Sequence, residues 1–123
     1  MYSIRIERIF SAAHAMLING EPETLHGHDW RVRVTLDSPT LDADGMVCDF
    51  HELEASLDLV LAPFLNANLN ETPPFDSVNP TAENVAGHVA AKLQPDLPAS
   101  VVSITVAVTE APGCEACCRL ERG

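Results

Sequence analysis

Trp30-Arg31-Val32-Arg33-Val34-Thr35-Leu36-Asp37 is the stretch that decides the fold. Its even positions are apolar and its odd positions are polar, so the hydrophobic period is two. Successive side chains of a strand point to opposite faces, and this period therefore predicts a strand with one buried face. Ser38-Pro39 follows directly and predicts the end of the strand, because proline cannot donate to a sheet ladder.

Three further segments show strand patterns on either side of this one. Tyr2 to His14 begins with Tyr2, Ile4 and Ile6 alternating with polar residues. Near the other end, residues 102–108 alternate Val, Ile, Val and Val with smaller or polar residues. Ala111-Pro112-Gly113 then predicts a turn into a last strand over Cys114–Arg122.

Between the two strand pairs, the hydrophobic period changes to that of helices. The first stripe is Phe50, Leu53, Leu57, Val60, Leu61 and Phe64, and the second is Ala82, Val85, Ala86, Val89, Ala90 and Leu93. Asp49 is the expected N-cap of the first helix, with Glu52 as its reciprocal partner, and Pro63 is expected to end it. Asn79-Pro80-Thr81 is expected to start the second helix, and prolines 95 and 98 to close it.

The resulting order is strand, strand, helix, helix, strand, strand. This order predicts an α+β fold, with an antiparallel sheet and both helices packed on one face. Neither a repeat nor a linker divides the chain, so residues 1–123 are expected to form a single domain. Long edge strands would stay unpaired in a monomer, and assembly of several copies into a β-barrel would pair them.

Composition and charge indicate which partners the protein is expected to bind and in which cell compartment it is expected to work. The formal net charge of −11 repels a phosphate backbone, so nucleic-acid binding is not expected. The chain shows neither a signal peptide nor an apolar stretch long enough for a membrane span. The cysteines, at 48, 114, 117 and 118, are spaced poorly for disulfides, which favours reduced thiols in the cytoplasm. The 114–118 cluster lacks a second pair for a structural zinc site and is interpreted as packing.

Histidines are the most informative candidates for chemistry. His26-Gly27-His28 places two imidazoles on the same side of an extended chain, and His14 ends the preceding strand. If the two strands are antiparallel neighbours, the three imidazoles can meet and leave a fourth position open, as in a catalytic zinc site. A His-x-His pair also occurs for structural reasons or by coincidence. His51 and His88 are expected near helix surfaces without a special role.

Several motifs resemble the family of 6-pyruvoyltetrahydropterin and 6-carboxytetrahydropterin synthases, in the same order along nearly the whole chain. They are Phe10-Ser11-Ala12-Ala13-His14, Leu25-His26-Gly27-His28-Asp29-Trp30, Gly45-Met46-Val47-Cys48-Asp49-Phe50, Pro80-Thr81-Ala82-Glu83-Asn84 and Val108-Thr109-Glu110. The resemblance implies the T-fold, in which trimers close a twelve-stranded barrel and two trimers stack as a homohexamer.

The resemblance also implies site residues. His14, His26 and His28 correspond to zinc ligands, and Glu110 corresponds to the residue that anchors a pterin. A carboxylate suits this role, because it can accept two adjacent N–H donors of the pterin ring as a bidentate pair. Without the family context, Glu110 reads as a solvated carboxylate at a strand end.

The chain departs from the family at the residues that transfer protons. Pro22 stands where family enzymes carry a catalytic cysteine, and residues 64–70 lack the Asp-His pair of the family. Glu23 lies three residues before His26, which resembles a variant subgroup that uses glutamate and forms 6-hydroxymethyl-7,8-dihydropterin. Glu23 is therefore either a general base or a plain loop carboxylate.

These observations predict a zinc-site lyase that binds 7,8-dihydroneopterin triphosphate or a related dihydropterin and acts on its side chain, with Glu23 as base. One alternative is a pterin-binding homologue that has lost synthase activity or takes another pterin-like substrate. The other is a metal-binding oligomer without a role in pterin chemistry.

Overall fold

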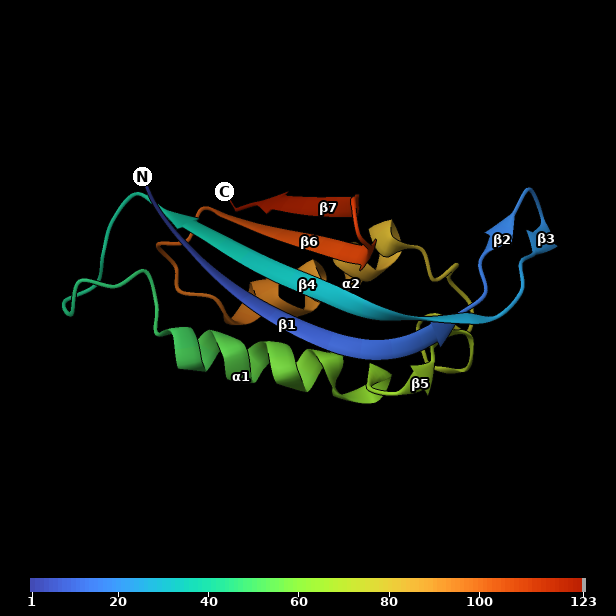
Figure 1. The fold of residues 1–123 in the computed structure, drawn as a ribbon. Coiled ribbons are helices and arrows are strands. Elements are labelled where there is room, and N and C mark those ends of the chain that lie inside the picture. The colour runs from blue at the N-terminus through green and yellow to red at the C-terminus, as the bar shows by residue number, and fades with distance from the viewer. Residues whose placement is uncertain (123) are drawn as a thin grey trace.

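The computed structural model describes residues 1–122 and shows one large sheet with two helices against it (Figure 1). The elements are β1 (Tyr2–His14), β2 (Leu17–Ile18), β3 (Glu21–Pro22), β4 (His26–Ser38), α1 (Phe50–Leu61), β5 (Ala67–Asn68), α2 (Ala82–Leu93), β6 (Ser103–Ala111) and β7 (Cys114–Glu121). The five-stranded sheet has the order β5-β1-β4-β6-β7. Its four long strands are antiparallel, and β5 adds a short parallel pairing to β1. The predicted α+β fold class is confirmed.

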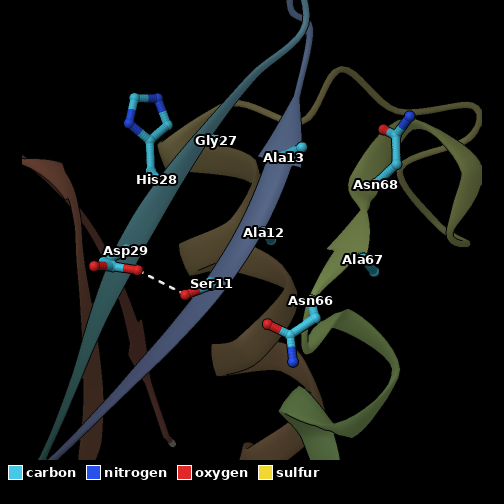
Figure 2. A pocket seen from close by; sticks show the side chains of 9 residues that line it. All are labelled: Ser11, Ala12, Ala13, Gly27, His28, Asp29, Asn66, Ala67 and Asn68. Atoms are coloured by element: carbon cyan, nitrogen blue, oxygen red, sulfur yellow. Dashed lines mark hydrogen bonds between the residues drawn. The ribbon is translucent and has the colours of Figure 1, made fainter.

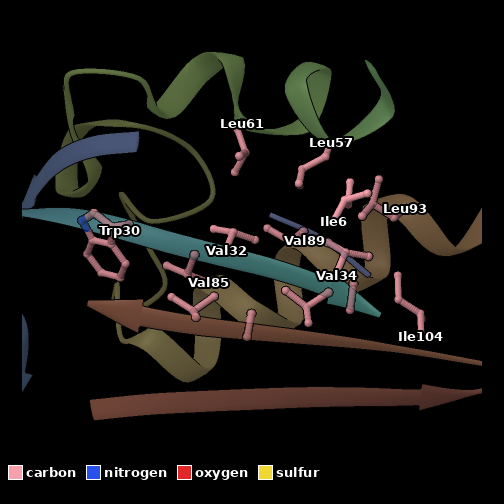
Figure 3. Close-up of a cluster of buried hydrophobic side chains, with 14 of the residues drawn as sticks. Ile6, Trp30, Val32, Val34, Leu57, Leu61, Val85, Val89, Leu93 and Ile104 are labelled. Atoms are coloured by element: carbon pink, nitrogen blue, oxygen red, sulfur yellow. The ribbon is translucent and has the colours of Figure 1, made fainter. Parts of the chain in front are cut away.

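The alternation in β4 sets which face of the sheet is covered. Trp30, Val32, Val34 and Leu36 are each 0% exposed and belong to one core cluster with residues of both helices. Figure 3 shows this row meeting side chains from both helices, among them Leu57, Leu61, Val85, Val89 and Leu93. Burying an aliphatic side chain contributes roughly 1.5–3 kcal/mol, so the two-residue period of β4 dictates this layer order.

Both helices begin and end near the residues expected from the sequence. Asp49 caps α1 by accepting a hydrogen bond from the His51 N–H (2.7 Å), and Thr81 caps α2 by accepting one from the Asn84 N–H (3.1 Å). The predicted return bond from Glu52 to Asp49 does not form within residues 1–122; the carboxylate instead lies in the first turn, where it complements the helix dipole. Within the same residues, neither helix is long and apolar enough to cross a bilayer.

Three short strands were not predicted from the sequence. β2 and β3 form a hairpin that extends beyond the end of the main sheet (Figure 1), and its turn places Asn19 and Gly20 at positive φ (53° and 79°). β4 also begins at His26, four residues before the predicted start. Strands of two residues are too short to show a hydrophobic period, and the pattern of β4 is interrupted by glycine and histidine. Side-chain alternation therefore gave no signal at these places.

Candidate active site

The candidate site lies where β6 stops pairing with β4 in the sheet, a place called the fork below. β6 pairs with β4 from Ser103 opposite Asp37 to Thr109 opposite Arg31, and the pairing of β6 with β7 has a register shift between Thr109 and Ala111. In residues 1–122, the first part of β4, His26–Trp30, pairs with β1 alone. A cavity of about 590 Å³ occupies this fork, with His28 on the β4 side and Glu110 on the β6 side.

The antiparallel register of β1 and β4 brings the three predicted ligand residues together. His14 pairs with His26, while His28 lies opposite Ala12 on the same face. The ring centroids of His14 are 4.7 Å from His26 and 5.1 Å from His28, and His26 and His28 are 4.7 Å apart. One nitrogen of each ring lies within 4.8 Å of the others, and His14 is fully buried. These residues are called the histidine cluster below.

Hydrogen bonds to backbone carbonyls orient two of these rings. His14 Nδ1 bonds the Pro80 carbonyl oxygen (2.7 Å), and His26 Nδ1 bonds the Thr24 carbonyl oxygen (2.8 Å). A carbonyl can only accept, so the proton lies on Nδ1 and the Nε2 lone pair faces the cluster. Buried Nε2 atoms of His14 and His28 have no hydrogen-bond partner in residues 1–122. Unpaired lone pairs converging at this spacing fit a metal ion bound by three imidazoles.

The charge state of His28 agrees with a ligand role. Burial lowers the pKa of the His28 imidazole; Glu110 opposes this shift, while His14 and His26 add to it. A lowered pKa keeps the ring neutral, and the neutral ring is the form that binds a metal ion.

Two carboxylates approach different members of the histidine cluster. Glu110 Oε2 lies 3.8 Å from His14 Nε2 and is buried without a hydrogen-bond partner in the described chain. Glu23 Oε1 lies 3.8 Å from His26 Nε2 and accepts the Met16 N–H at 2.9 Å. Glu23 is thus bound to the loop beside the cluster, and Glu110 offers a free acceptor inside the cavity.

A second hollow, of about 520 Å³, lies beside β1 near the short strand β5 (Figure 2). On one side Ser11 Oγ donates a 2.6 Å hydrogen bond to Asp29, and on the other side are Asn66 and Asn68. Residues 64–70 therefore present neutral amides to this hollow. Asp29 and Ser11 were not singled out from the sequence; the polar residue directly after His28 was the available signal.

The remaining candidates lie apart from the cluster. Cys117 is exposed and Cys118 packs against the core, and all four cysteines are free thiols. His51 is exposed on α1. His88 is more enclosed than its expected place on a helix surface, because its ring packs against Phe64 and Phe75, with centroids 5.5 and 5.6 Å away.

The antiparallel sheet, its two helices and the histidine cluster define a T-fold protein with a three-histidine site. The chain belongs to the 6-pyruvoyl tetrahydropterin synthase family, whose profile matches residues 3–121.

The relatives that the chain resembles have different named activities. The chain is 35% identical over 92 residues to the dihydroneopterin monophosphate aldolase of Pyrococcus furiosus, covering 75% of each chain. It is 37% identical over 100 residues to the 6-carboxy-5,6,7,8-tetrahydropterin synthase of Synechocystis sp., covering 76% of each. The crystal structure of 6-pyruvoyl tetrahydropterin synthase from Plasmodium vivax superposes with a TM-score of 0.82 at 19% identity, over 98% of both chains.

Proposed function

We propose that this protein is a lyase that cleaves the side chain of a 7,8-dihydroneopterin phosphate and forms 6-hydroxymethyl-7,8-dihydropterin. The observation that carries this proposal is the Glu23 carboxylate, held 3.8 Å from His26 in a site that lacks the family cysteine and Asp-His pair. Resemblance to an aldolase of Pyrococcus furiosus supports this type of reaction. In the Plasmodium vivax synthase, a glutamate is a catalytic residue, which supports glutamate as a base on this fold.

Glu110 is proposed to hold the pterin ring. Its Oε2 is buried, lacks a partner in residues 1–122 and lines the cavity at the fork. The carboxylate can accept two adjacent ring N–H donors, and these charge-assisted bonds are strong where water is excluded. Glu110 lies 3.8 Å from the His14 imidazole, so the proposed anchor and the histidine cluster belong to one site.

The histidine cluster is proposed to hold a zinc ion through His14, His26 and His28. Bound zinc would supply Lewis acidity to the side-chain hydroxyls of the substrate and make their protons easier to remove. The protein prepares for this by fixing the Nδ1 protons of His14 and His26 on carbonyl oxygens.

Glu23 is proposed to take the proton of the C2′ hydroxyl. The C1′–C2′ bond then breaks and C2′ leaves as an aldehyde carrying the phosphate end. The bonding electron pair forms a C1′=C6 double bond while the π electrons of C6=N5 move to N5. The proton returns to C1′, which gives 6-hydroxymethyl-7,8-dihydropterin and a glycolaldehyde phosphate. This route needs removal of an acidified O–H proton, whereas a synthase must remove a C–H proton. A single carboxylate base suits the former task.

The assembly is proposed to be a homohexamer built from two trimers, in the reducing cytoplasm. β7 pairs with β6 along one side and leaves its other side open, which is the edge that a barrel of several copies would pair. Four free thiols fit a reducing compartment. Light scattering on the purified protein measures the number of copies, and a monomer at micromolar concentration would contradict this part of the proposal.

The activity is tested by incubating metal-loaded protein with 7,8-dihydroneopterin, its monophosphate and its triphosphate, and separating the products by chromatography. Glu23→Gln is expected to lower turnover by about 100-fold or more, the usual contribution of a general base. Glu21→Gln is the matched control, since Glu21 lies two residues away on the exposed hairpin and is expected to leave turnover unchanged. Equal turnover in the two variants would exclude Glu23 as the base.

A second candidate function is pterin binding without chemistry. The neutral amides of Asn66 and Asn68, in the region where the family has an Asp-His pair, favour it. In that case the same incubation gives no product, while titration with neopterin still shows saturable binding that depends on Glu110.

A further inference from the structure

The segment that joins β1 to the hairpin is held by two asparagine side chains from distant parts of the chain. Asn70 accepts the Ala15 N–H through Oδ1 (2.8 Å) and donates Nδ2–H to the Ala15 carbonyl (2.7 Å). Asn79 makes the same pair with Leu17, at 2.9 Å in both directions. Each side-chain amide thus hydrogen-bonds both the N–H and the carbonyl of one residue, as a neighbouring strand would. These two pairs of hydrogen bonds are called the asparagine clamps below.

Met16 lies between Ala15 and Leu17 and is hydrogen-bonded to Glu23. The Met16 N–H donates to Glu23 Oε1 (2.9 Å), and the Glu23 N–H donates to the Met16 carbonyl (3.0 Å). The carboxylate therefore takes its position from a backbone that Asn70 holds on one side and Asn79 on the other. The β2–β3 ladder adds two residue pairs to this hairpin, Leu17 with Pro22 and Ile18 with Glu21.

The residues next to Asn79 also contribute to the site. Pro80 offers its carbonyl to His14 Nδ1, and Thr81 caps α2. The Asn79 carbonyl accepts the Asn84 side-chain N–H (2.8 Å), which ties this residue to the first turn of the helix. The start of α2 is thus a fixed reference for both the histidine cluster and the hairpin.

We infer that Asn70 and Asn79 are positioning residues that hold Glu23 beside His26, and that without them the hairpin remains attached but the carboxylate loses its place. A two-residue β pairing cannot hold a hairpin rigidly by itself, because short isolated hairpins are marginally stable in water. The inference rests on the proposed role of Glu23 as base.

The test compares Asn79→Asp and Asn70→Asp with Asn19→Asp. Aspartate keeps the size of the side chain but removes the Nδ2–H donor and adds a charge that faces the Leu17 or Ala15 carbonyl. Asn19→Asp adds the same charge at the tip of the same hairpin, where the side chain takes no part in either clamp. Thermal melts identify any variant that fails to fold, and Asn79→Ser then serves as a smaller change at the same site.

Each clamp variant is expected to lower kcat by about 10- to 100-fold while KM and neopterin affinity stay within about twofold, because a misplaced catalytic group costs turnover rather than ring binding. In a Glu23→Gln background, Asn79→Asp is expected to cause no further loss of kcat, since both changes remove proton transfer by a correctly placed Glu23 carboxylate. Unchanged kcat in the clamp variants, or fully additive losses in the double variant, would overturn the inference.

Hydrogen exchange separates this inference from the proposed function. If the wild-type protein shows no turnover, the lyase proposal fails, and exchange of the Met16 amide still reports the clamp. That amide is expected to exchange about tenfold faster in Asn79→Asp and at the wild-type rate in Asn19→Asp. Equal protection of Met16 in both variants would show that Asn79 does not hold the segment that carries Glu23.

Discussion

Replacing Glu110 by glutamine tests the pterin anchor with the smallest change of shape. The side chain is 22% exposed, its Oε2 is buried, and Oε2 has no partner in residues 1–122, so water compensates poorly for a lost bond to a ligand. Glutamine turns one of the two acceptors into an NH₂ donor. One charge-assisted bond, of about 1.5–3 kcal/mol, is lost, and two donors then face each other. A total of about 3 kcal/mol corresponds to a dissociation constant raised by roughly 100-fold.

The assay is fluorescence titration with neopterin in the presence of a metal chelator. The chelator matters because Glu110 lies 3.8 Å from His14, and its charge could alter affinity through a bound metal. Glu83→Gln is the matched control: Glu83 is exposed, lines a small hollow together with Glu110, and loses the same charge. An affinity of Glu110→Gln within threefold of wild type would refute the anchor, and equal losses in both variants would show a general charge effect.

Three further outcomes follow from the site and the core. His28→Ala is expected to abolish the binding of about one zinc ion per chain, measured by elemental analysis after dialysis, whereas His51→Ala keeps it because His51 is exposed on α1. Trp30→Phe is expected to lower the free energy of unfolding in urea by about 2–4 kcal/mol. It removes the 3.1 Å hydrogen bond from the indole N–H to the buried Ala12 carbonyl and leaves a cavity. A loss under about 0.5 kcal/mol would contradict this expectation. Burial, with the charge of Lys92, lowers the pKa of His88, so the unfolded chain takes up a proton more readily than the folded one. The contribution of His88 to the free energy of unfolding should therefore be full above about pH 6.5 and fall as the pH drops below it. His88→Gln should flatten this slope in urea titrations between about pH 5 and 8.

The periodic segments were predictable because their signal is local. β1 is Tyr2–His14 as expected, and α1 and α2 end at Leu61 and Leu93, just before Pro63 and Pro95. The histidine cluster was also accessible, since a His-x-His pair in an extended segment and a histidine at the end of its neighbour converge in an antiparallel register. The hairpin and β5 gave no such signal, because two residues are too few to show a period.

The sequence by itself determined the order of strands and helices, the buried row of β4 and the three imidazoles, because each depends on spacing along a few neighbouring residues. Only the tertiary structure decided where Glu23 lies. Its place depends on Asn70 and Asn79, which are 55 and 62 residues away from the backbone groups they bind. A hydrogen bond between an amide side chain and a distant backbone leaves no pattern in the chain, and it forms only when folding brings both partners within 3 Å.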